Sequence, residues 1–330
     1  METYKIQQQF FNHLKTLLPP HLSLVDELCD VLGLSADSVY RRIRGEKPIA
    51  LSELKIICDK YQISLDHVLQ LQNNSVVFQA PEINRRNTSF TEYLNDIIRQ
   101  LKYFNSFEKR QMLYLSKDLP FWHFYTFPEI AAFKTFVWLK TIKNNPAYAN
   151  TRFSLEEHVF DDCFQLGQEM INQYNQIPSV ELWNFESIMS TTRQIEYYRD
   201  AGIFANPKDL DIVVDSFERS IEHIRQQVEK GIKFLPGKSD LNHKASLKFY
   251  VNEVVLGNNS IMLELNGNQV SFVTYNVFDF MMTKDPRFTD IVFSNFYTIM
   301  SRSSLISETG EKERNRFFGA LKKKIQDLKK

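Results

Sequence analysis

The sequence predicts a mainly α-helical chain. A small N-terminal domain of about five helices precedes a larger helical domain, which ends in a small three-stranded antiparallel sheet with covering helices (α+β). Glycine is rare and aromatic residues are frequent, with 10 Gly, 27 Phe and 14 Tyr in 330 residues, a composition that favours packed helices. Apolar residues recur three and four apart up to about residue 231. Alternation of apolar and polar residues begins only after Lys244.

The composition changes after Leu71. Gln72-Asn73-Asn74-Ser75, Pro81 and Asn84-Arg85-Arg86-Asn87 are typical of turns and linkers. We therefore predict a domain over residues 1–72, a linker over 73–88, a helical domain over 89–245, and a sheet with C-terminal helices over 246–330 that packs with the helical domain.

Helix start and stop signals follow one another closely in the N-terminal domain. Ser23 is an expected N-cap, and Gly33 and Gly45 are expected stops, because glycine tolerates the left-handed backbone that ends a helix. Apolar spacing predicts helices over 3–18, 24–32, 36–44 and 51–61, and a last helix that Ser64 caps and that runs to Leu71. The inner face of the helix over 51–61 is expected to be Leu51, Leu54, Ile57 and Cys58. Two short helices joined by a tight turn at 33–35 form a helix-turn-helix.

This unit resembles the Cro and phage-repressor type of helix-turn-helix in the order and spacing of its residues. The matching residues are Leu28, Leu32-Gly33-Leu34-Ser35, Val39, Arg44-Gly45-Glu46, Leu51, Leu54 and Ile63-Ser64-Leu65-Asp66. The resemblance covers about residues 3–71, roughly a fifth of the chain, and implies binding to operator DNA. It assigns the recognition helix to residues 35–44, with the first residues of that helix at base edges in the major groove.

Val39 and Ile43 lie four residues apart and are expected to face the core, which leaves the opposite side of this helix for DNA. The family has an apolar residue where this chain has Arg42, a departure that a slight rotation of the helix would accommodate. Val25 and Ala36 stand where the family often has Gln, so those contacts are not carried over. The candidate DNA-binding residues are Ser35, Ala36, Asp37, Ser38, Tyr40, Arg41, Arg42, Arg44 and Lys47.

The charge of the domain gives divided support to DNA binding, which depends largely on cations placed on phosphates. Residues 1–72 hold eight Lys or Arg and nine Asp or Glu, so the domain is not basic. Four of the eight cations nevertheless lie between Arg41 and Lys47. The alternative interpretation is a solvated helix face, or a helix-turn-helix that binds another protein.

Two features of the middle region each have two interpretations. Aromatic residues are dense between Leu119 and Trp138, where they form either a hydrophobic core or a pocket for an apolar or flat ligand. The second feature is an apolar seam, a row of apolar residues spaced three and four apart along one predicted helix. This seam either joins two subunits or packs within the chain. Its residues are Val214, Phe217, Ile221, Ile224 and Val228. Pro178 is expected in the first turn of a helix.

Strands are expected over 247–256, 261–265 and 270–275 as an antiparallel meander, with Asn266-Gly267 as a tight hairpin turn. Helices over 286–302 and 308–328 are expected to cover this sheet.

Motifs that carry catalysis or cofactor binding are not found in the sequence. The chain has no GxxxxGK[ST], GxGxxG, HExxH or GxSxG, and its seven His and three Cys show no metal-ligand spacing. We therefore expect no enzyme activity, no cofactor and no metal site. The odd number of cysteines and the lack of a signal peptide or of a run of about 18 apolar residues predict a cytoplasmic protein with no membrane contact.

These observations together predict a sequence-specific DNA-binding transcriptional regulator. Its expected partners are double-stranded DNA and a second copy of the chain in a homodimer, with a small-molecule or peptide effector on the C-terminal region. Such a dimer sets its two recognition helices about 34 Å apart. The alternative is a protein–protein interaction module or scaffold that reuses a helix-turn-helix fold.

Overall fold

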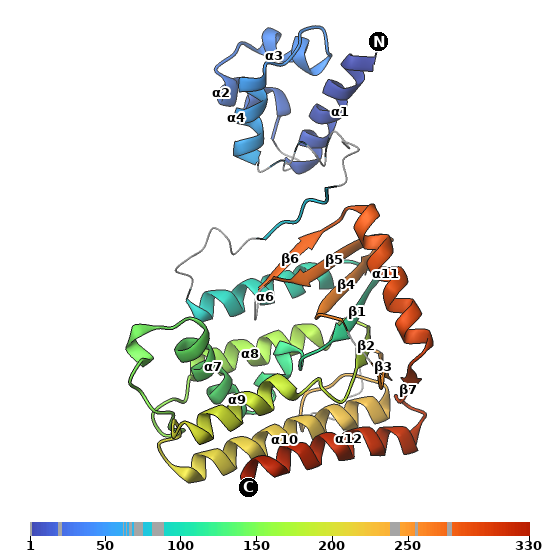
Figure 1. Cartoon of the computed structure of the whole chain (residues 1–330). Helices are drawn as coiled ribbons and strands as arrows, with labels where there is room; N and C mark the ends of the chain where they lie inside the picture. The colour runs from blue at the N-terminus through green and yellow to red at the C-terminus, as the bar shows by residue number, and fades with distance from the viewer. Residues whose placement is uncertain are drawn as a thin grey trace. The chain divides into compact units, whose positions relative to one another are not determined.

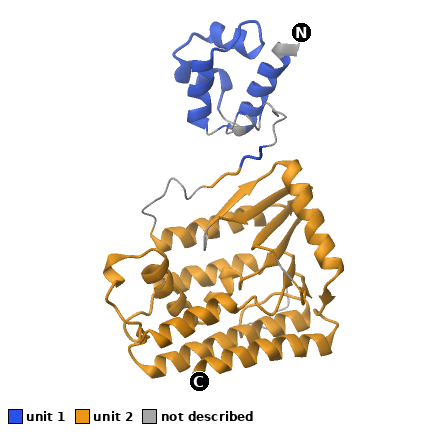
Figure 2. Cartoon of the chain, viewed as in Figure 1, with its two compact units in different colours: residues 1–77 blue, residues 78–330 orange. Residues whose placement is uncertain are grey.

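The structure, a computed structural model, divides the chain into two compact units, residues 1–77 and residues 78–330 (Figure 2). Each unit has its own hydrophobic core. The residues that the structure describes are 2–18, 22–61, 63, 65, 68, 75–80, 89–237, 245–254, 257–275 and 279–330.

The first unit contains four described helices, whose positions confirm the predictions for this part of the chain. They are α1 (Glu2–Leu17), α2 (Leu24–Leu32), α3 (Ala36–Ile43) and α4 (Leu51–Tyr61). The expected last helix, which Ser64 would cap, lies largely outside the described residues.

The core of the first unit forms where α1 crosses the helix-turn-helix. Phe10 and Leu14 of α1 meet Leu28 of α2, Val39 of α3 and Ile57 of α4, all of them buried. The prediction that Leu51 belongs to the inner face of α4 is wrong, because its side chain is 84% exposed. Leu51 is the first residue of α4, and residues 50–52 all lie at the surface, so the apolar stripe of this helix reaches the core only from its second turn.

In the described part of the chain, the second unit is built on one seven-stranded mixed sheet with the strand order β6-β5-β4-β1-β2-β3-β7 (Figure 1). β1, β2 and β3 run parallel, and all other neighbouring strands run antiparallel. The prediction of a small three-stranded antiparallel sheet is therefore wrong. The strands are β1 (Arg110–Ser116), β2 (Ser179–Trp183), β3 (Leu247–Val251), β4 (Ser260–Leu265), β5 (Asn268–Thr274), β6 (Phe280–Thr283) and β7 (Ser304–Leu305).

β1 and β2 lie in the region that the sequence predicts to be helical throughout. Both strands are central and almost fully buried on both faces, so they show none of the alternation that marks a half-exposed strand. Pro178 precedes β2 instead of opening a helix, and its carbonyl accepts a hydrogen bond from the Met112 amide at 2.9 Å. A short buried run of this kind has the same apolar pattern in a strand and in a buried helix, which is why the prediction failed.

Part of the predicted C-terminal meander is confirmed. Asn266 and Gly267 join β4 to β5 with φ angles of 49° and 86°, the positive values that a two-residue hairpin turn requires. β3, the expected first strand of the meander, pairs with β2 and β7 instead, because β1 and β2 lie between β3 and β4. β6 forms the third strand of the meander by pairing with β5.

Helices cover both faces of the sheet (Figure 1). Met112 and Leu263 point from their strands into the large core, to which six of the described α-helices contribute, whereas Leu113 points to the opposite face. There α11 (Pro286–Ser301) packs Phe293 and Phe296 against the sheet. The helices of the large core are α6 (Phe90–Asn105), α7 (Pro128–Val137), α8 (Asp161–Tyr174), α9 (Met189–Asp200), α10 (Pro207–Lys230) and α12 (Glu311–Gln326).

The apolar seam predicted near Val214 lies on α10, and all five of its residues are buried within the chain's own core. α10 and α12 run side by side along the base of the unit in Figure 1. Of the two interpretations of this seam, packing within the chain is the one that the structure supports.

Candidate nucleic-acid interface

The α2–turn–α3 segment has the local geometry that its capping residues predict. The Ser23 hydroxyl accepts a hydrogen bond from the Asp26 amide at 3.4 Å, which caps the start of α2. Gly33 ends α2 with a left-handed φ of 64°, and the Leu34 amide then donates to the Cys29 carbonyl at 3.2 Å. Ser35 has the extended backbone of an N-cap, although its side chain makes no capping hydrogen bond. The chain thus turns sharply into α3.

One side of α3 faces solvent along its whole length. Successive residues of a helix are rotated by about 100°, so the five most exposed positions of α3 and its C-cap fall within an arc of about 140°. These positions are Ala36, Asp37, Tyr40, Arg41 and Arg44. The opposite side carries Val39, which is 1% exposed, and half-buried Ser38 and Ile43. Ser35 and Lys47 are exposed beyond the two ends of α3.

Arg42 lies inside the unit, apart from the other candidate residues. Its side chain is 6% exposed and forms a bidentate ion pair with Glu53, with Nη2 at 2.6 Å from Oε1 and Nε at 2.9 Å from Oε2. Nη1 also donates to the Ser38 carbonyl at 3.0 Å. Arg42 therefore occupies the position where the Cro-type pattern has an apolar residue, and Glu53 compensates its charge.

The exposed cations at the end of α3 share one carboxylate. Arg44 pairs with Glu46 through Nε and Oε1 at 2.7 Å, and Arg41 Nε lies 4.0 Å from Oε2 of the same residue. The hydrogen bond to Glu46 raises the pKa of Arg44 and lowers the pKa of Glu46, so both groups stay charged near neutral pH. Because all three side chains are about half exposed, water screens this cluster and a phosphate can compete with Glu46 for the arginines.

Two supporting residues were missed by the sequence analysis. Gln7 of α1 donates to the Arg42 carbonyl at 2.6 Å and to the Lys47 carbonyl at 2.8 Å, and it accepts from the Ile49 amide at 3.0 Å. This one side chain therefore ties α1 to the loop that carries Lys47. The second is Glu53, which also accepts from the Ala50 amide at 3.0 Å. The contacts of Gln7 and the Arg42–Glu53 ion pair join residues more than ten apart in the sequence, and no local sequence pattern predicts such a contact.

Other ionisable groups of the chain form no metal site in the described residues, where no group of three or more His, Cys, Asp or Glu side chains is close enough to hold an ion. The buried pair Glu181 and Lys233 is satisfied by its own surroundings. Glu181 accepts from Tyr174 and from Trp183 Nε1 at 2.9 Å, and Lys233 donates to the Ile177 carbonyl at 2.8 Å. These contacts hold the centre of the core together.

The helices in the described ranges are all too short or too polar to span a lipid bilayer.

Comparison with known proteins finds a similarity in the N-terminal part of the chain. A family model described as the BetR domain matches residues 20–89, about a fifth of the chain, and this stretch includes α2, α3 and α4. The BetR domain is a DNA-binding domain family of the helix-turn-helix type. No curated protein and no solved structure matches the chain. The first unit is thus similar to a DNA-binding domain family.

Proposed function

We propose that this chain is a sequence-specific DNA-binding transcriptional regulator and that α3 is its recognition helix. The observation that carries the proposal is the exposed side of α3, which presents Arg41 and Arg44 from a helix held by a tight turn. The similarity of residues 20–89 to the BetR domain supports it independently. In this arrangement α3 enters the major groove, and its exposed arginines contact base edges and phosphates.

The finer parts of the proposal concern the class of the regulator and its assembly. We infer a helix-turn-helix of the Cro and phage-repressor type, working in the cytoplasm as a homodimer. The second unit then provides dimerisation, effector binding or both, and no catalytic step is needed for this role. Two recognition helices related by twofold symmetry read two half-sites about one turn of DNA apart.

Selection of binding sites from a library of random duplexes, with the purified full-length protein, tests the proposal directly. We expect a recovered palindrome, and an affinity for it that falls steeply as salt rises because phosphate contacts release counterions. A library that yields no enriched sequence, together with binding that does not depend on salt, would contradict DNA recognition.

The variant Glu46→Gln makes this test sharper. Removing the carboxylate that Arg41 and Arg44 share leaves more positive charge at the end of α3. If this end contacts DNA phosphates, the variant should bind all duplexes more tightly than the wild type at one fixed salt concentration. Asp59→Asn on the exposed surface of α4 is the matched control, because it removes an equal charge away from α3.

A second candidate function is binding to another protein through the same side of α3. The acidic balance of residues 1–72 and the exposed Tyr40, which is 48% accessible, favour it. Duplex binding by Glu46→Gln that equals the wild type, together with the absence of an enriched sequence, is the outcome that selects this alternative.

A further inference from the structure

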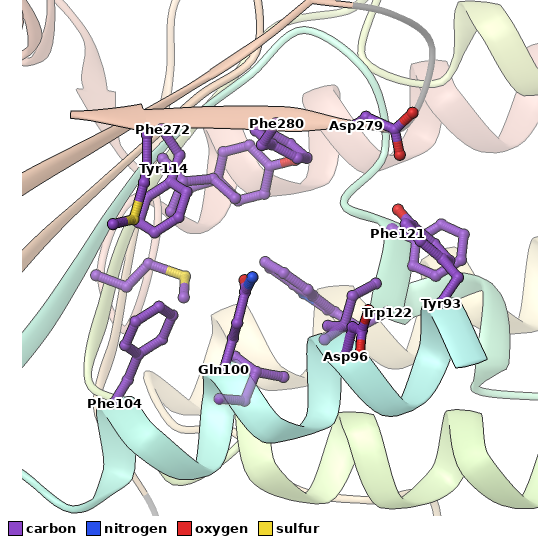
Figure 3. A pocket seen from close by; sticks show the side chains of 15 residues that line it. Tyr93, Asp96, Gln100, Phe104, Tyr114, Phe121, Trp122, Phe272, Asp279 and Phe280 are labelled. Carbon is purple, nitrogen blue, oxygen red and sulfur yellow. The ribbon is translucent and has the colours of Figure 1, made fainter. Parts of the chain in front are cut away.

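The second unit contains a cavity of about 110 Å³ between α6, β1 and the strands β4 to β6 (Figure 3). Seven aromatic side chains line it, and most of its remaining described wall is aliphatic or thioether. In Figure 3, Gln100 of α6 lies on one side of the cavity, and Tyr114 and Phe280 of the sheet lie on the other. Phe121 and Trp122 reach it from the aromatic segment for which the sequence left core and pocket as alternatives. Most of that segment is core, and these two residues border the cavity.

The cavity wall is built from rings that hold one another in place. Tyr114 and Trp122 meet edge to face with centroids 5.6 Å apart, and Trp122 also stacks on Tyr174 at 4.3 Å. Phe104 and Phe272 meet at 5.9 Å on another part of the wall. Because these contacts join two helices, two strands and the segment after β1, the wall keeps its shape without a ligand.

The described wall gives the cavity no uncompensated charge. None of its residues is Lys, Arg or His, and its two acids, Asp96 and Asp279, both have interaction partners. The partner of Asp96 is Arg99 on the same helix. A charged ligand would lose its hydration here without gaining a free counter-charge, and this loss costs far more for an ion than for a neutral molecule. The cavity therefore favours a neutral ligand.

One buried polar group of the wall is left for a ligand. The Tyr114 side chain is 3% exposed, and its hydroxyl makes no hydrogen bond to the residues that the structure describes. Burial raises the pKa of this hydroxyl, so it stays protonated and neutral at pH 7. A buried hydroxyl without a partner destabilises the protein, because its hydrogen bonds to water are lost and not replaced. A ligand that exchanges a hydrogen bond with Tyr114 removes this cost.

The volume limits the ligand to about one ring with a small substituent. A dry protein cavity of about 150 Å³ is known to bind benzene, so 110 Å³ is of the right order for a single six-membered ring. Gln100, Phe104, Phe272 and Met282 also line an adjoining groove of about 890 Å³. A ligand therefore has a path of entry past Gln100, which is exposed.

We propose that this cavity binds a small neutral molecule with one aromatic ring and one hydroxyl group. The ring lies among the aromatic side chains of the wall, and the hydroxyl group forms a hydrogen bond with Tyr114. As the effector site of the regulator, the cavity rests on the function proposed above. Binding itself is measured on the protein without DNA, so the ligand assignment and DNA recognition can fail separately.

Four probes with one aromatic ring test this assignment on the wild-type full-length protein at pH 7. Phenol and toluene are neutral and nearly equal in shape, benzylamine is a cation and benzoate is an anion. Titration calorimetry at one salt concentration should show phenol and toluene binding at millimolar concentration, and at least about tenfold weaker binding of the two charged probes. No binding of phenol at millimolar concentration, or a charged probe that binds as tightly as phenol, overturns the proposal.

Tyr114→Phe tests the hydrogen bond, because it removes the hydroxyl and keeps the ring that meets Trp122. This variant should bind phenol about three- to tenfold more weakly than the wild type and bind toluene with unchanged affinity. Tyr103→Phe is the matched control, since Tyr103 is 55% exposed and lines the adjoining groove without lining the cavity. A Tyr114→Phe protein that keeps the wild-type affinity for phenol, or that loses phenol and toluene affinity equally, overturns the proposal, as does an equal loss of phenol affinity in Tyr103→Phe.

Discussion

At the scale of single residues, the adjacent arginines Arg41 and Arg42 have different surroundings and should respond differently to mutation. Arg41 is 52% exposed on the outer side of α3, where a guanidinium can donate two hydrogen bonds to a guanine edge. We expect Arg41→Ala to weaken operator binding by about 1–3 kcal/mol and to relax the preference at one base position. Fluorescence anisotropy with the selected operator and its single-base variants measures both effects.

Arg41→Lys is the matched control, because it keeps the charge and loses the paired donors. A base contact predicts that the lysine variant loses the base preference as the alanine variant does, while a phosphate contact predicts near wild-type binding by the lysine variant. If Arg41→Ala folds and retains both affinity and base preference, α3 is not the recognition helix.

Arg42→Met should affect the stability of the first unit instead. The change leaves Glu53 without its bidentate partner and should cost about 1–3 kcal/mol of unfolding free energy at pH 7, measured by circular dichroism on residues 1–77. The Arg42 hydrogen bond lowers the pKa of Glu53 below its ordinary value of 4.5. A depressed carboxyl pKa stabilises the fold above that value, so the difference between variant and wild type should shrink as the pH falls below about 4.5. A difference that stays constant down to pH 2 would rule out the ion pair as its cause.

Lys134 of α7 gives the second unit a pH dependence of the same sign in a higher pH range. Nζ donates to Gln194 Oε1 at 2.6 Å and lies 4.1 Å from the centre of the Phe124 ring. Burial lowers the pKa of Lys134 from 10.5 to about 7, and the nearby Asp118 opposes the shift. Between these two values the unfolded chain binds more protons than the folded one, so this lysine makes stability rise with pH from about 7 to 10.

Lys134→Met should remove that dependence. Relative to the wild type, the variant should be most favoured at pH 7 and below, and its advantage should decline by on the order of 1 kcal/mol per pH unit toward pH 10. Urea unfolding monitored by tryptophan fluorescence measures this difference, because Trp122, Trp138 and Trp183 all lie in the second unit. An advantage that does not vary between pH 7 and 10 would show that the pKa of Lys134 is not lowered in the core.

At the scale of elements, the packing of α8 against the segment after β1 depends on a glycine. A Cβ atom at Gly167 would lie 2.1 Å from Cδ1 of Tyr125, whose side chain is 0% exposed and has no room to move. Alanine is favoured over glycine in a helix by about 1 kcal/mol, and overpacking a rigid core costs about 1–3 kcal/mol or more. Because the clash involves a buried ring, we expect Gly167→Ala to destabilise the second unit.

The matched control is Gly319→Ala in α12, where no atom lies within 4 Å of the added Cβ. This variant should be neutral or more stable by up to about 1 kcal/mol. The two midpoints of urea unfolding, read by tryptophan fluorescence, should therefore shift in opposite directions. A Gly167→Ala protein that is as stable as Gly319→Ala would contradict the close packing of α8 on Tyr125.

The same scale shows which elements a sequence can predict. The described helices of the first unit and α11 have amphipathic patterns, and their predicted positions agree with the structure within two residues. Capping side chains also mark the starts of α2 and α11. The hairpin at Asn266-Gly267 was equally predictable, because few residue pairs tolerate two positive φ angles. β1 and β2 were not, since a strand buried on both faces has no periodicity of its own. The pairing of β3 with β2 was not predictable either. The order of strands in the sheet includes β1 and β2, which the hydrophobic pattern did not reveal.

The candidate site was predictable to a similar degree. Val39 as a core residue and Arg41 and Arg44 as exposed residues follow from helical spacing. The burial of Arg42 does not, because it depends on Glu53, eleven residues away on another helix.

At the scale of the whole molecule, the remaining question is what the second unit adds to the first. Residues 1–77 form a compact unit with their own core, so the fragment should fold and contact a single half-site of DNA. If the second unit holds two copies of the chain together, binding of one half-site makes binding of the other intramolecular. The full chain should then bind the palindromic operator at least about a hundredfold more tightly than the fragment.

A duplex with one half-site scrambled provides the control, because tethering confers no advantage when a single site is present. On that duplex the fragment and the full chain should bind with similar affinity, at the same salt concentration as before. Circular dichroism of the fragment establishes that it is folded in both measurements. Equal affinity of fragment and full chain for the intact palindrome would mean that the second unit does not dimerise the protein on DNA.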